Sequence, residues 1–282
     1  MILDGKIVAE KRRIMLKEEI DRAVAKGIRA PHLVIITVGD DPASKTYVRN
    51  KIKACEEIGI IVRHYCFAAD DEPRAVLDLI RTLNNAPRIN GIMVQLPLPE
   101  GWYERQIIDA INPQKDVDGL TTTNIGKLRS GQLCIEPCTA AGVIDLLDYY
   151  DIRLDGKDVT IVGRSNIVGK PLADMMMQRG ATVTQCHSCT NDLLFHTITA
   201  DILISAVGKP KFITDNMIKY GATVIDVGIH RDNNGKLCGD VDYENVSEKT
   251  NHITPVPGGV GPMTVAMLLR NTVFCWRKQN EI

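Results

Sequence analysis

The chain has 282 residues, of which 44% are hydrophobic and 24% charged, with a formal net charge of −1. This length leaves room for two domains, and the composition is that of a soluble globular protein. The near-zero net charge argues against a general nucleic-acid or membrane-surface role, because both favour a basic excess. No apolar run reaches the roughly 18 residues of a membrane span. The N-terminus also lacks a signal-peptide apolar region, so we expect a cytoplasmic protein.

The eight cysteines are scattered along the chain. On paper, Cys186, His187 and Cys189 could be combined with Cys134 and Cys138 into a zinc site. However, a second close C-x-x-C pair is missing, and Cys186 ends a predicted strand, where a free cysteine packs as a small hydrophobe. We therefore expect no metal, and thiols that stay reduced as in the cytoplasm.

The first part of the chain alternates predicted helices with predicted strands. The expected helices span 6–26, 42–58 and 73–83, and the expected strands span 32–38, 61–67 and 89–94. The first strand, HLVIITV, is an almost continuous apolar run, which is typical of a strand covered on both faces. Asp41 and Pro42 then supply an N-cap and a proline at the first helical position.

Two polar positions in this part are candidates for function. Tyr47 and Lys51 lie one turn apart beside Ser44 on one face of the second predicted helix, although such a pair is usually ordinary surface. Gln95 ends the third predicted strand and is followed by Leu-Pro-Leu-Pro. Two alternating prolines cannot continue a central strand, so Gln95 is expected at a strand's carboxyl end, where open α/β sheets bind ligands. Each X-Pro bond of this loop is a candidate for the cis form.

The segment 112–120, NPQKDVDGL, is polar and rich in turn residues. Asp116 and Asp118 are two positions apart, so in extended chain their side chains point the same way. The alternative is a solvated loop without function. Pro137-Cys138-Thr139 then opens another predicted helix, with Thr139 as its cap. We place the domain boundary between about 120 and 138.

The segment 158–170, DVTIVGRSNIVGK, reads as strand, glycine turn and helix. That order begins a nucleotide-binding βαβ unit, with phosphate expected at the helix N-terminus. The spacing is Gly163-x-Ser165-x-x-x-Gly169, which departs from the usual G-x-G-x-x-G. A serine at the second glycine position should hold the pyrophosphate further away, or contact it through its hydroxyl.

The end of the following strand, 181–185, indicates which dinucleotide binds. NAD sites usually place an acidic residue about 20 positions after the first glycine, to bind the ribose 2′-hydroxyl. Here the strand is followed by Cys186, His187 and Ser188, with no carboxylate before Asp192. Arg164 lies inside the turn and stays charged. An arginine and a hydroxyl suit a 2′-phosphate, so we predict NADP; the alternative is a surface arginine without a ligand.

Further strands are predicted at 201–206 and 222–227, separated by helix-length segments in the rhythm of a parallel doubly wound sheet. Val227-Gly228-Ile229 ends the last of them at the ligand edge. The segment 253–264, ITPVPGGVGPMT, precedes a helix predicted from about Met263 to Trp276. Its glycines would leave N–H groups free at a positive helix end, which suits anionic or carbonyl groups, although an ordinary loop is the alternative.

Six short motifs follow one another in an order typical of one enzyme family. They are Tyr47-Val-x-x-Lys51, Val94-Gln95-Leu96-Pro97, Lys115 to Leu120 (KDVDGL), Pro137-Cys138-Thr139, Gly163-Arg164-Ser165 and Pro257 to Thr264 (PGGVGPMT). Together they resemble the bifunctional methylenetetrahydrofolate dehydrogenase/methenyltetrahydrofolate cyclohydrolase family, over about residues 3 to 275. No single motif would settle the matter, but chance does not readily produce six in the right order.

The resemblance implies an α/β fold of two domains with a cleft between them. A three-layer α/β domain that binds folate would comprise residues 1–120 plus 270–282. A Rossmann-like, doubly wound NADP-binding domain would comprise residues 138–265. The resemblance also implies a homodimer formed through the NADP-binding domain.

Two consecutive reactions are implied as well. A hydride passes from 5,10-methylenetetrahydrofolate to NADP+, and water then opens the 5,10-methenyl cation to give 10-formyltetrahydrofolate. Hydride transfer is the cofactor's own chemistry, for which the protein positions the two ligands. The second step needs a group that exchanges a proton near neutrality, and a lysine serves where burial and a neighbour lower its pKa. No metal is needed, because the methenyl cation is already an electrophile.

Four catalytic positions follow from the resemblance. Lys51 would be the catalytic base or proton relay, and Gln95 would bond to the lysine and poise it. Tyr47 would pack on the folate ring system, and Asp118 would hold the amino edge of the pterin.

The wider substrate and cofactor contacts follow in the same way. Besides Tyr47, Lys51, Gln95 and Asp118, the substrate site would contain Val94, Leu96, Pro257, Gly258, Gly259, Val260, Gly261, Pro262, Met263, Thr264 and Val265. The NADP contacts would be Thr139, Gly163, Arg164, Ser165, Ser188 and Ile229. The expected partners are tetrahydrofolate derivatives, with neither nucleic acid nor membrane.

Two rival functions stay open. One is another two-domain NADP dehydrogenase, similar to the shikimate or amino-acid dehydrogenases, with which we do not associate QLPLP or PGGVGPMT. The other is a non-catalytic nucleotide- or folate-binding regulator on the same fold, since a fold does not determine function. The presence of Lys51, Gln95 and Asp118 argues against that regulator.

Overall fold

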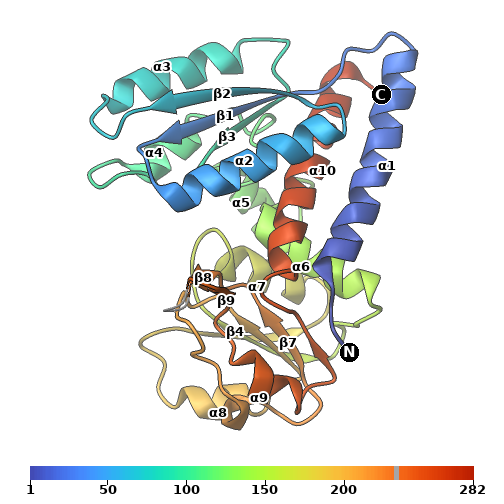
Figure 1. The fold of residues 1–282 in the computed structure, drawn as a ribbon, viewed down its shortest axis with the longest axis vertical. Coiled ribbons are helices and arrows are strands. Elements are labelled where there is room, and N and C mark those ends of the chain that lie inside the picture. The colour runs from blue at the N-terminus through green and yellow to red at the C-terminus, as the bar shows by residue number, and fades with distance from the viewer. Residues whose placement is uncertain (232–234) are drawn as a thin grey trace. The chain divides into compact units, whose positions relative to one another are not determined.

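The chain folds into two compact units, each built around one parallel sheet (Figure 1). The computed structural model describes residues 1–231 and 235–282. The three-strand unit comprises residues 11–127, 132–138 and 265–282, and the five-strand unit comprises residues 1–10, 128–131 and 139–264. The predicted two-domain α/β fold with parallel sheets is therefore confirmed.

The first ten residues are an exception to the predicted domain ranges, which place them with the N-terminal sheet. They belong to the five-strand unit because their backbone joins its outer strand. The Leu3 N–H donates to the Ile253 carbonyl at 2.8 Å, and the Gly5 N–H donates to the Gly258 carbonyl at 2.9 Å.

The sheet of the three-strand unit has the order β2-β1-β3, with all strands parallel. Its members are β1 (His32–Val38), β2 (Ile61–Phe67) and β3 (Gly91–Val94). β1 lies in the centre, as its continuous apolar sequence predicts. β3 begins two residues later than expected, and its last residue precedes Gln95.

Helices cover both faces of this sheet. They are α2 (Pro42–Glu57), α3 (Pro73–Asn84), α4 (Glu104–Asp109) and α5 (Thr122–Arg129), together with most of α1 (Gly5–Ala25) and of α10 (Val260–Asn280). Val34 and Ile36 of β1 share an apolar core with Ile80 of α3. Because strand side chains alternate, Thr37 faces the other side, where it lines a cavity with Val48 of α2. Figure 1 shows α2 and α3 on opposite faces of the sheet, which gives three layers.

The five-strand unit has a doubly wound sheet of order β10-β7-β6-β4-β5, again entirely parallel. Its strands are β4 (Asp158–Val162), β5 (Thr182–Cys186), β6 (Ile202–Ser205), β7 (Thr223–Asp226) and β10 (His252–Ile253). The chain leaves β4 for β5 on one side and returns past β4 to β6 on the other. The strand order therefore reverses at β4, and the carboxyl end of such a switch point is where doubly wound sheets bind ligands.

The remaining elements of this unit are short. They are α6 (Cys138–Tyr149), α7 (Gly169–Met177), α8 (Leu193–Thr197), a 3₁₀ turn (Asp215–Met217), the hairpin β8 (His230–Arg231) with β9 (Leu237–Cys238), and α9 (Tyr243–Ser247). The segment between β6 and β7 has helix length, as predicted, but its residues 206–222 form only the 3₁₀ turn and no α-helix. Gly208 and Lys211 both have left-handed backbone there, with φ of 73° and 51°, which prevents a helix from continuing.

Two predicted helix starts are also corrected. α6 already includes Cys138, so Thr139 lies inside the helix and does not cap it. α10 begins at Val260, three residues before the predicted Met263, so part of the glycine-rich segment is helical. Both errors arise because proline and glycine near a helix start indicate a boundary without locating it to a single residue.

Neither a membrane span nor a metal cluster is found in the part of the chain that the structure describes. No helix there combines the length and the hydropathy that crossing a bilayer requires. All eight cysteines are free, and the described residues contain no group of three or more His, Cys, Asp or Glu side chains arranged to hold a metal ion. Cys186 is buried at the end of β5, while Cys189 is exposed.

Candidate functional site

Lys51 and Gln95 meet at the carboxyl end of β3. Lys51 is 8% exposed on α2, and its Nζ donates to the Oε1 of Gln95 at 3.0 Å. The same Nζ lies 3.6 Å from the Sδ of Met93. The Nε2 of Gln95 donates to the Leu96 carbonyl at 2.6 Å, which turns Oε1 towards the lysine. The amine is thus held by an amide that is itself fixed by the following loop, in which Leu96-Pro97 is cis.

Tyr47 lies one turn before Lys51 on α2, which starts where its sequence predicts. The Asp41 carboxylate accepts a 2.7 Å hydrogen bond from the Ser44 N–H, and a proline occupies the first turn. The Tyr47 side chain is 38% exposed, and its partial burial raises the pKa of its phenol above the usual value. The ring therefore offers a neutral aromatic surface beside the lysine.

Asp116 and Asp118, which the sequence pairs, have different surroundings. The buried carboxylate of Asp116 accepts hydrogen bonds from the N–H groups of Gly119 and Thr121, at 3.0 and 2.8 Å, and from the Asn124 side chain at 2.9 Å. Its role is to hold the loop together.

Asp118 has its carboxylate free of those loop contacts. Burial raises the pKa of Asp118, while the positive charge of Lys51 opposes that rise and the Asp116 charge adds to it. A hydrogen bond from the Cys138 thiol also favours the ionised form. Burial and the Asp118 carboxylate raise the pKa of Cys138 well above its usual value, so this thiol stays protonated and can donate. Asp118 is thus the carboxylate of this loop that faces the lysine.

Asn271, on α10, was not predicted from the sequence. It is buried, and its Nδ2 donates to the carbonyls of Val117 and Glu136, both at 2.9 Å. These two residues precede Asp118 and Cys138, so one side-chain amide ties together the segments that carry them. The signal was present in the sequence as a single amide inside the apolar run of the last helix.

The glycine turn after β4 is as tight as its sequence predicts. Gly163 has φ of 133°, and a Cβ there would lie 2.3 Å from the Ala206 carbonyl oxygen. A Cβ on Gly169 would lie 2.3 Å from the Gly163 carbonyl oxygen. Both positions therefore require glycine, one for the turn and one for close packing of helix on strand.

Ser165 and Arg164 lie between these glycines and are both exposed. The Ser165 hydroxyl accepts from the N–H groups of Val168 and Gly169, at 3.2 and 3.4 Å, so it caps the start of α7. Within residues 1–231 and 235–282, the Arg164 guanidinium has neither a hydrogen-bond nor an ion-pair partner. Its charge is therefore available to an anionic ligand.

Ser188 lies at the tip of a turn that follows β5. The His187 N–H donates to the Thr190 hydroxyl at 2.8 Å, and the Cys189 N–H donates to the His187 Nδ1 at 3.1 Å. This turn leaves Ser188 exposed. The first acidic residue after the strand, Asp192, instead caps α8 by accepting from the Phe195 N–H at 3.3 Å.

Ile229 follows β7, between two residues that are both held by buried carboxylates. The Gly228 N–H donates to Asp226 at 2.9 Å, and the His230 Nε2 lies 2.7 Å from Asp240. Ile229 itself is 39% exposed. It is thus an apolar side chain presented at the carboxyl edge of the sheet.

The glycine-rich segment packs closely against the first residues of the chain. A Cβ on Gly5 would lie 1.9 Å from the Gly259 carbonyl oxygen, so Gly5 cannot be replaced without moving that segment. The Val256-Pro257 bond is cis, and Pro257 is exposed. At the other end of the segment, the Thr264 hydroxyl lies 3.2 Å from that of Thr139.

The structure thus gathers the predicted residues into two sets. In the three-strand unit, Lys51 contacts Gln95 and is electrostatically coupled to Asp118, with Tyr47 one helical turn away. The buried Val94 and the partly buried Leu96 flank Gln95, and Val265 belongs to the same unit. In the five-strand unit, the predicted cofactor residues lie at the carboxyl ends of β4, β5 and β7 and on α6, and the predicted folate segment 257–264 lies at the start of α10.

Comparison with known proteins covers nearly the whole chain. Residues 3–118 match the catalytic domain of tetrahydrofolate dehydrogenase/cyclohydrolase, and residues 137–280 match the NAD(P)-binding domain of the same family. The bifunctional protein FolD of Moorella thermoacetica is 53% identical over 277 residues, which is 98% of this chain and 99% of that protein.

Solved structures agree with this match. The bifunctional enzyme FolD, a methylenetetrahydrofolate dehydrogenase/cyclohydrolase from Campylobacter jejuni, is 47% identical with a TM-score of 0.97, covering 100% of this chain and 99% of that one. The Trypanosoma brucei methylenetetrahydrofolate dehydrogenase-cyclohydrolase, complexed with NADP cofactor and inhibitor, is 36% identical with a TM-score of 0.95, covering 100% and 99%. The chain therefore belongs to the tetrahydrofolate dehydrogenase/cyclohydrolase family.

Proposed function

We propose that the chain catalyses both reactions for which its relatives are named. It would oxidise 5,10-methylenetetrahydrofolate with NADP+ and hydrolyse the 5,10-methenyl product to 10-formyltetrahydrofolate. The observation that carries this proposal is the hydrogen bond between Lys51 and Gln95, with the Asp118 carboxylate coupled to the same amine. A non-catalytic regulator would have no need of an oriented, buried lysine.

The five-strand unit fits a dinucleotide with a 2′-phosphate. Gly163 and Gly169 allow the turn to pack tightly against the backbone at the carboxyl end of β4, where doubly wound sheets bind a pyrophosphate. Arg164 has no partner among the described residues, and the acid that would select a 2′-hydroxyl, Asp192, caps a helix instead. Bound NADP+ would supply the hydride acceptor. The protein's part is to hold it through residues 163–165, Ser188, Ile229 and Thr139.

In the hydrolytic step, water adds to the one-carbon centre of the methenyl cation and loses a proton. The bond from this carbon to N5 then breaks, and the second proton of the water is transferred to N5. We assign these proton transfers to Lys51, because its amine is oriented by Gln95 and largely shielded from solvent. The cation needs no metal to activate it.

Further groups are proposed to contact the substrate. The Tyr47 ring offers an apolar face for the folate ring system, and the Asp118 carboxylate accepts hydrogen bonds from the pterin amino edge. Residues 257–265 would line the folate from the start of α10. The ranges proposed for folate and NADP binding stay 1–120 with 270–282 and 138–265, although residues 1–10 group with the five-strand sheet, and Cys138 and Val265 group with the three-strand sheet.

The experiment is a pair of assays on one preparation. Purified protein is given 5,10-methylenetetrahydrofolate with NADP+ or NAD+, and reduction is followed in the near-ultraviolet nicotinamide band. Hydrolysis of added methenyltetrahydrofolate is followed separately, without cofactor. We expect both activities and a preference for NADP+. Absence of nicotinamide reduction would refute the dehydrogenase assignment, and absence of hydrolysis would refute the other half.

The state of the protein in the cell belongs to the same proposal. We propose a homodimer assembled through the five-strand unit and a cytoplasmic location. Sedimentation equilibrium tests the first directly, because a monomer mass of 31.2 kDa at micromolar concentration would contradict it.

A further inference from the structure

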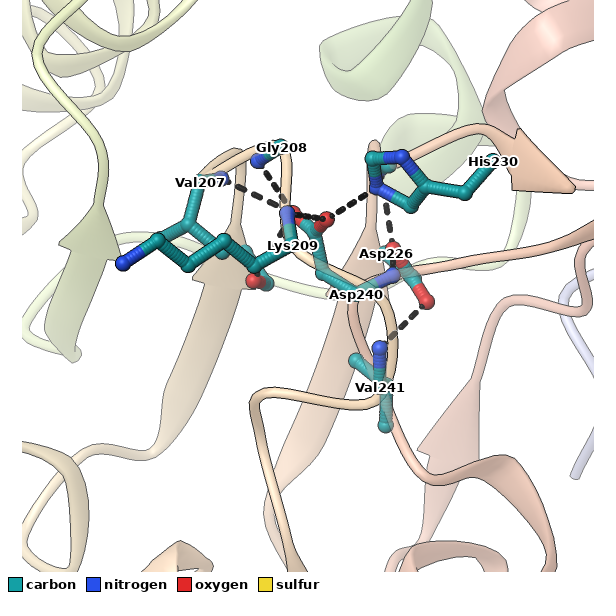
Figure 2. Close-up of polar contacts among 9 residues, drawn as sticks. Val207, Gly208, Lys209, Asp226, His230, Asp240 and Val241 are labelled. Carbon is teal, nitrogen blue, oxygen red and sulfur yellow. Dashed lines mark hydrogen bonds and ion pairs between the residues drawn. The ribbon is translucent and has the colours of Figure 1, made fainter. Parts of the chain in front are cut away.

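Asp240 is a fully buried carboxylate that collects hydrogen bonds from two loops (Figure 2). Its Oδ2 accepts hydrogen bonds from the N–H groups of Val207 and Gly208, at 2.8 and 3.4 Å, and from the Ser205 hydroxyl at 3.1 Å. Its Oδ1 accepts a hydrogen bond from the Lys209 N–H at 3.0 Å and lies 2.7 Å from the His230 Nε2. Five donors converging on one side chain suit an ionised carboxylate, which has acceptor sites only.

A second buried carboxylate, that of Asp226, holds the backbone that carries Asp240. The Asp226 carboxylate accepts from the backbone N–H groups of Gly228, Asp240 and Val241, at 2.9, 3.0 and 2.9 Å. A Cβ on Gly239 would lie 1.9 Å from Asp226 Oδ2, so the backbone carrying Asp240 rests directly against this second carboxylate. The two aspartates thus form one unit, in which Asp226 sets the position of Asp240.

The loops that this unit holds lie at the ligand edge of the sheet. Residues 207–209 follow β6, and residues 228–230 follow β7. Gly163, at the switch point, approaches the same β6 loop, because a Cβ there would meet the Ala206 carbonyl oxygen. Ile229 is fixed on both sides, through Gly228 by Asp226 and through His230 by Asp240. Ligands of doubly wound sheets bind where these loops meet.

We propose that Asp240, supported by Asp226 and paired with His230, is a positioning residue for the cofactor. It sets the two loops, 207–209 and 228–230, at the distance that NADP+ requires, and it touches neither substrate nor reacting atoms. The inference rests on the proposed NADP-dependent dehydrogenase activity. It predicts that loss of the carboxylate weakens cofactor binding while the cofactor-independent hydrolysis continues.

The test is Asp240→Asn in the full-length protein. An asparagine has the same shape, but its NH₂ group replaces one of the two acceptor oxygens. The N–H donors that faced this oxygen would then face another donor and lose their hydrogen bonds. Hydrogen bonds to a charged group are strong enough that we expect the dissociation constant for NADP+ to rise by about tenfold to a hundredfold. The rate of hydrolysis of added methenyltetrahydrofolate should change less than about twofold. Asp215→Asn removes an exposed carboxylate of the same unit and should alter neither quantity.

A second pair of variants keeps the test decisive if Asp240→Asn does not fold. His230→Ala removes one donor to Asp240 from the edge of the network, and His230→Gln restores an N–H donor. We expect weaker NADP+ binding in the first and substantial recovery in the second.

Unchanged NADP+ affinity in Asp240→Asn, or in His230→Ala if only that variant folds, would overturn the proposal. So would an equal loss of both activities together with a lower melting temperature, because that result indicates general stability. Failure of the proposed function itself is distinguishable, since the wild-type protein would then reduce no NADP+ in the first place.

Discussion

The Nζ of Lys51 lies 3.0 Å from the Oε1 of Gln95, although 44 residues separate them in the chain. One comes from the α2 face that follows β1, and the other from the first residue after β3. Their contact therefore depends on the pairing of β1 with β3, which brings the carboxyl ends of both strands to one edge. Any change that shifts this register would separate the amine from the amide that orients it.

The first prediction is that Lys51→Met separates the two activities. Methionine keeps most of the length and apolar bulk of the side chain but lacks the amine. General acid–base catalysis is typically worth about a hundredfold to ten-thousandfold, so hydrolysis should fall by that factor. Hydride transfer should survive in part, and methenyltetrahydrofolate should accumulate, as chromatography of the products would show.

The matched control is Lys53→Met, which removes an exposed amine from the same helix. It should leave both rates close to those of the wild type. Hydrolysis at wild-type speed in Lys51→Met would mean that the lysine only binds substrate.

Arg164 is predicted to select NADP+ over NAD+. Its guanidinium lacks a partner among the described residues, so its removal should cost little stability. A charge-assisted hydrogen bond is worth roughly 1.5–3 kcal/mol. Arg164→Ala should therefore weaken NADP+ binding by about tenfold to a hundredfold and leave NAD+ binding nearly unchanged. Isothermal titration with both dinucleotides decides it, and equal losses for the two would disprove this role.

Asp118 is predicted to bind folate in its ionised form. Burial raises the pKa of Asp118, so this carboxylate is protonated at a higher pH than an ordinary aspartate. Folate affinity should therefore begin to fall at that higher pH as the solution is acidified. Asp118→Asn should bind folate about tenfold to a hundredfold more weakly at neutral pH, because the charge is gone. It should also lack this pH dependence. Titration of tetrahydrofolate binding between about pH 4 and 8 checks both, and wild-type affinity in the variant would exclude the assignment.

Asn271 is predicted to hold Asp118 in place from α10. Asn271→Ala leaves the Glu136 carbonyl without its side-chain donor and the Val117 carbonyl with only the weak Cys138 thiol donor at 3.3 Å, and an unsatisfied buried group costs about 1–3 kcal/mol. The free energy of unfolding should fall accordingly in urea titrations. Folate affinity should fall as well, while NADP+ affinity stays within about twofold of the wild-type value. A variant with reduced stability but normal folate affinity would show that Asn271 only stabilises the fold.

Asp226 is predicted to make stability depend on pH in the acidic range. Burial raises its pKa to about 6 from a usual value of 3.8. Between those values the native state binds more protons than the unfolded chain, so the contribution of Asp226 falls as pH rises, by on the order of 3 kcal/mol in all. Asp226→Asn lacks this titration. The difference in unfolding free energy, wild type minus variant, should therefore decrease from pH 4 to pH 6, and a constant difference would contradict the raised pKa.

Much of the fold was predictable because its strands are local apolar runs with clear ends. His32–Val38 and Ile61–Phe67 agree with the sequence residue for residue, since glycine, proline or polar residues end each run. The short elements α4, α5 and β8–β9 were missed. They form through contacts with the rest of their unit, and helices or hairpins of that length have little stability of their own.

The site was predictable to a different degree. The positions of Lys51, Gln95 and Asp118 follow from motifs, and their roles stay predictions until the variants are measured. Asn271, Asp226 and Asp240 could not be singled out, because a buried polar residue is recognised only when the donors around it are known. The capping roles of Ser165 and Asp192 likewise depend on where the following helices begin.

The assignment of residues 1–10 to one unit and 265–282 to the other has a consequence for how the protein is made. Each unit includes a stretch from the far end of the chain, so no single cut yields two self-sufficient fragments. On the ribosome the strands of the three-strand sheet are synthesised early. The loop that carries Asp118 cannot form its hydrogen bond with Asn271 until the last helix has been synthesised. A fragment ending at residue 138 should therefore bind folate poorly even if its sheet forms, and adding the 265–282 peptide in trans should restore part of that binding.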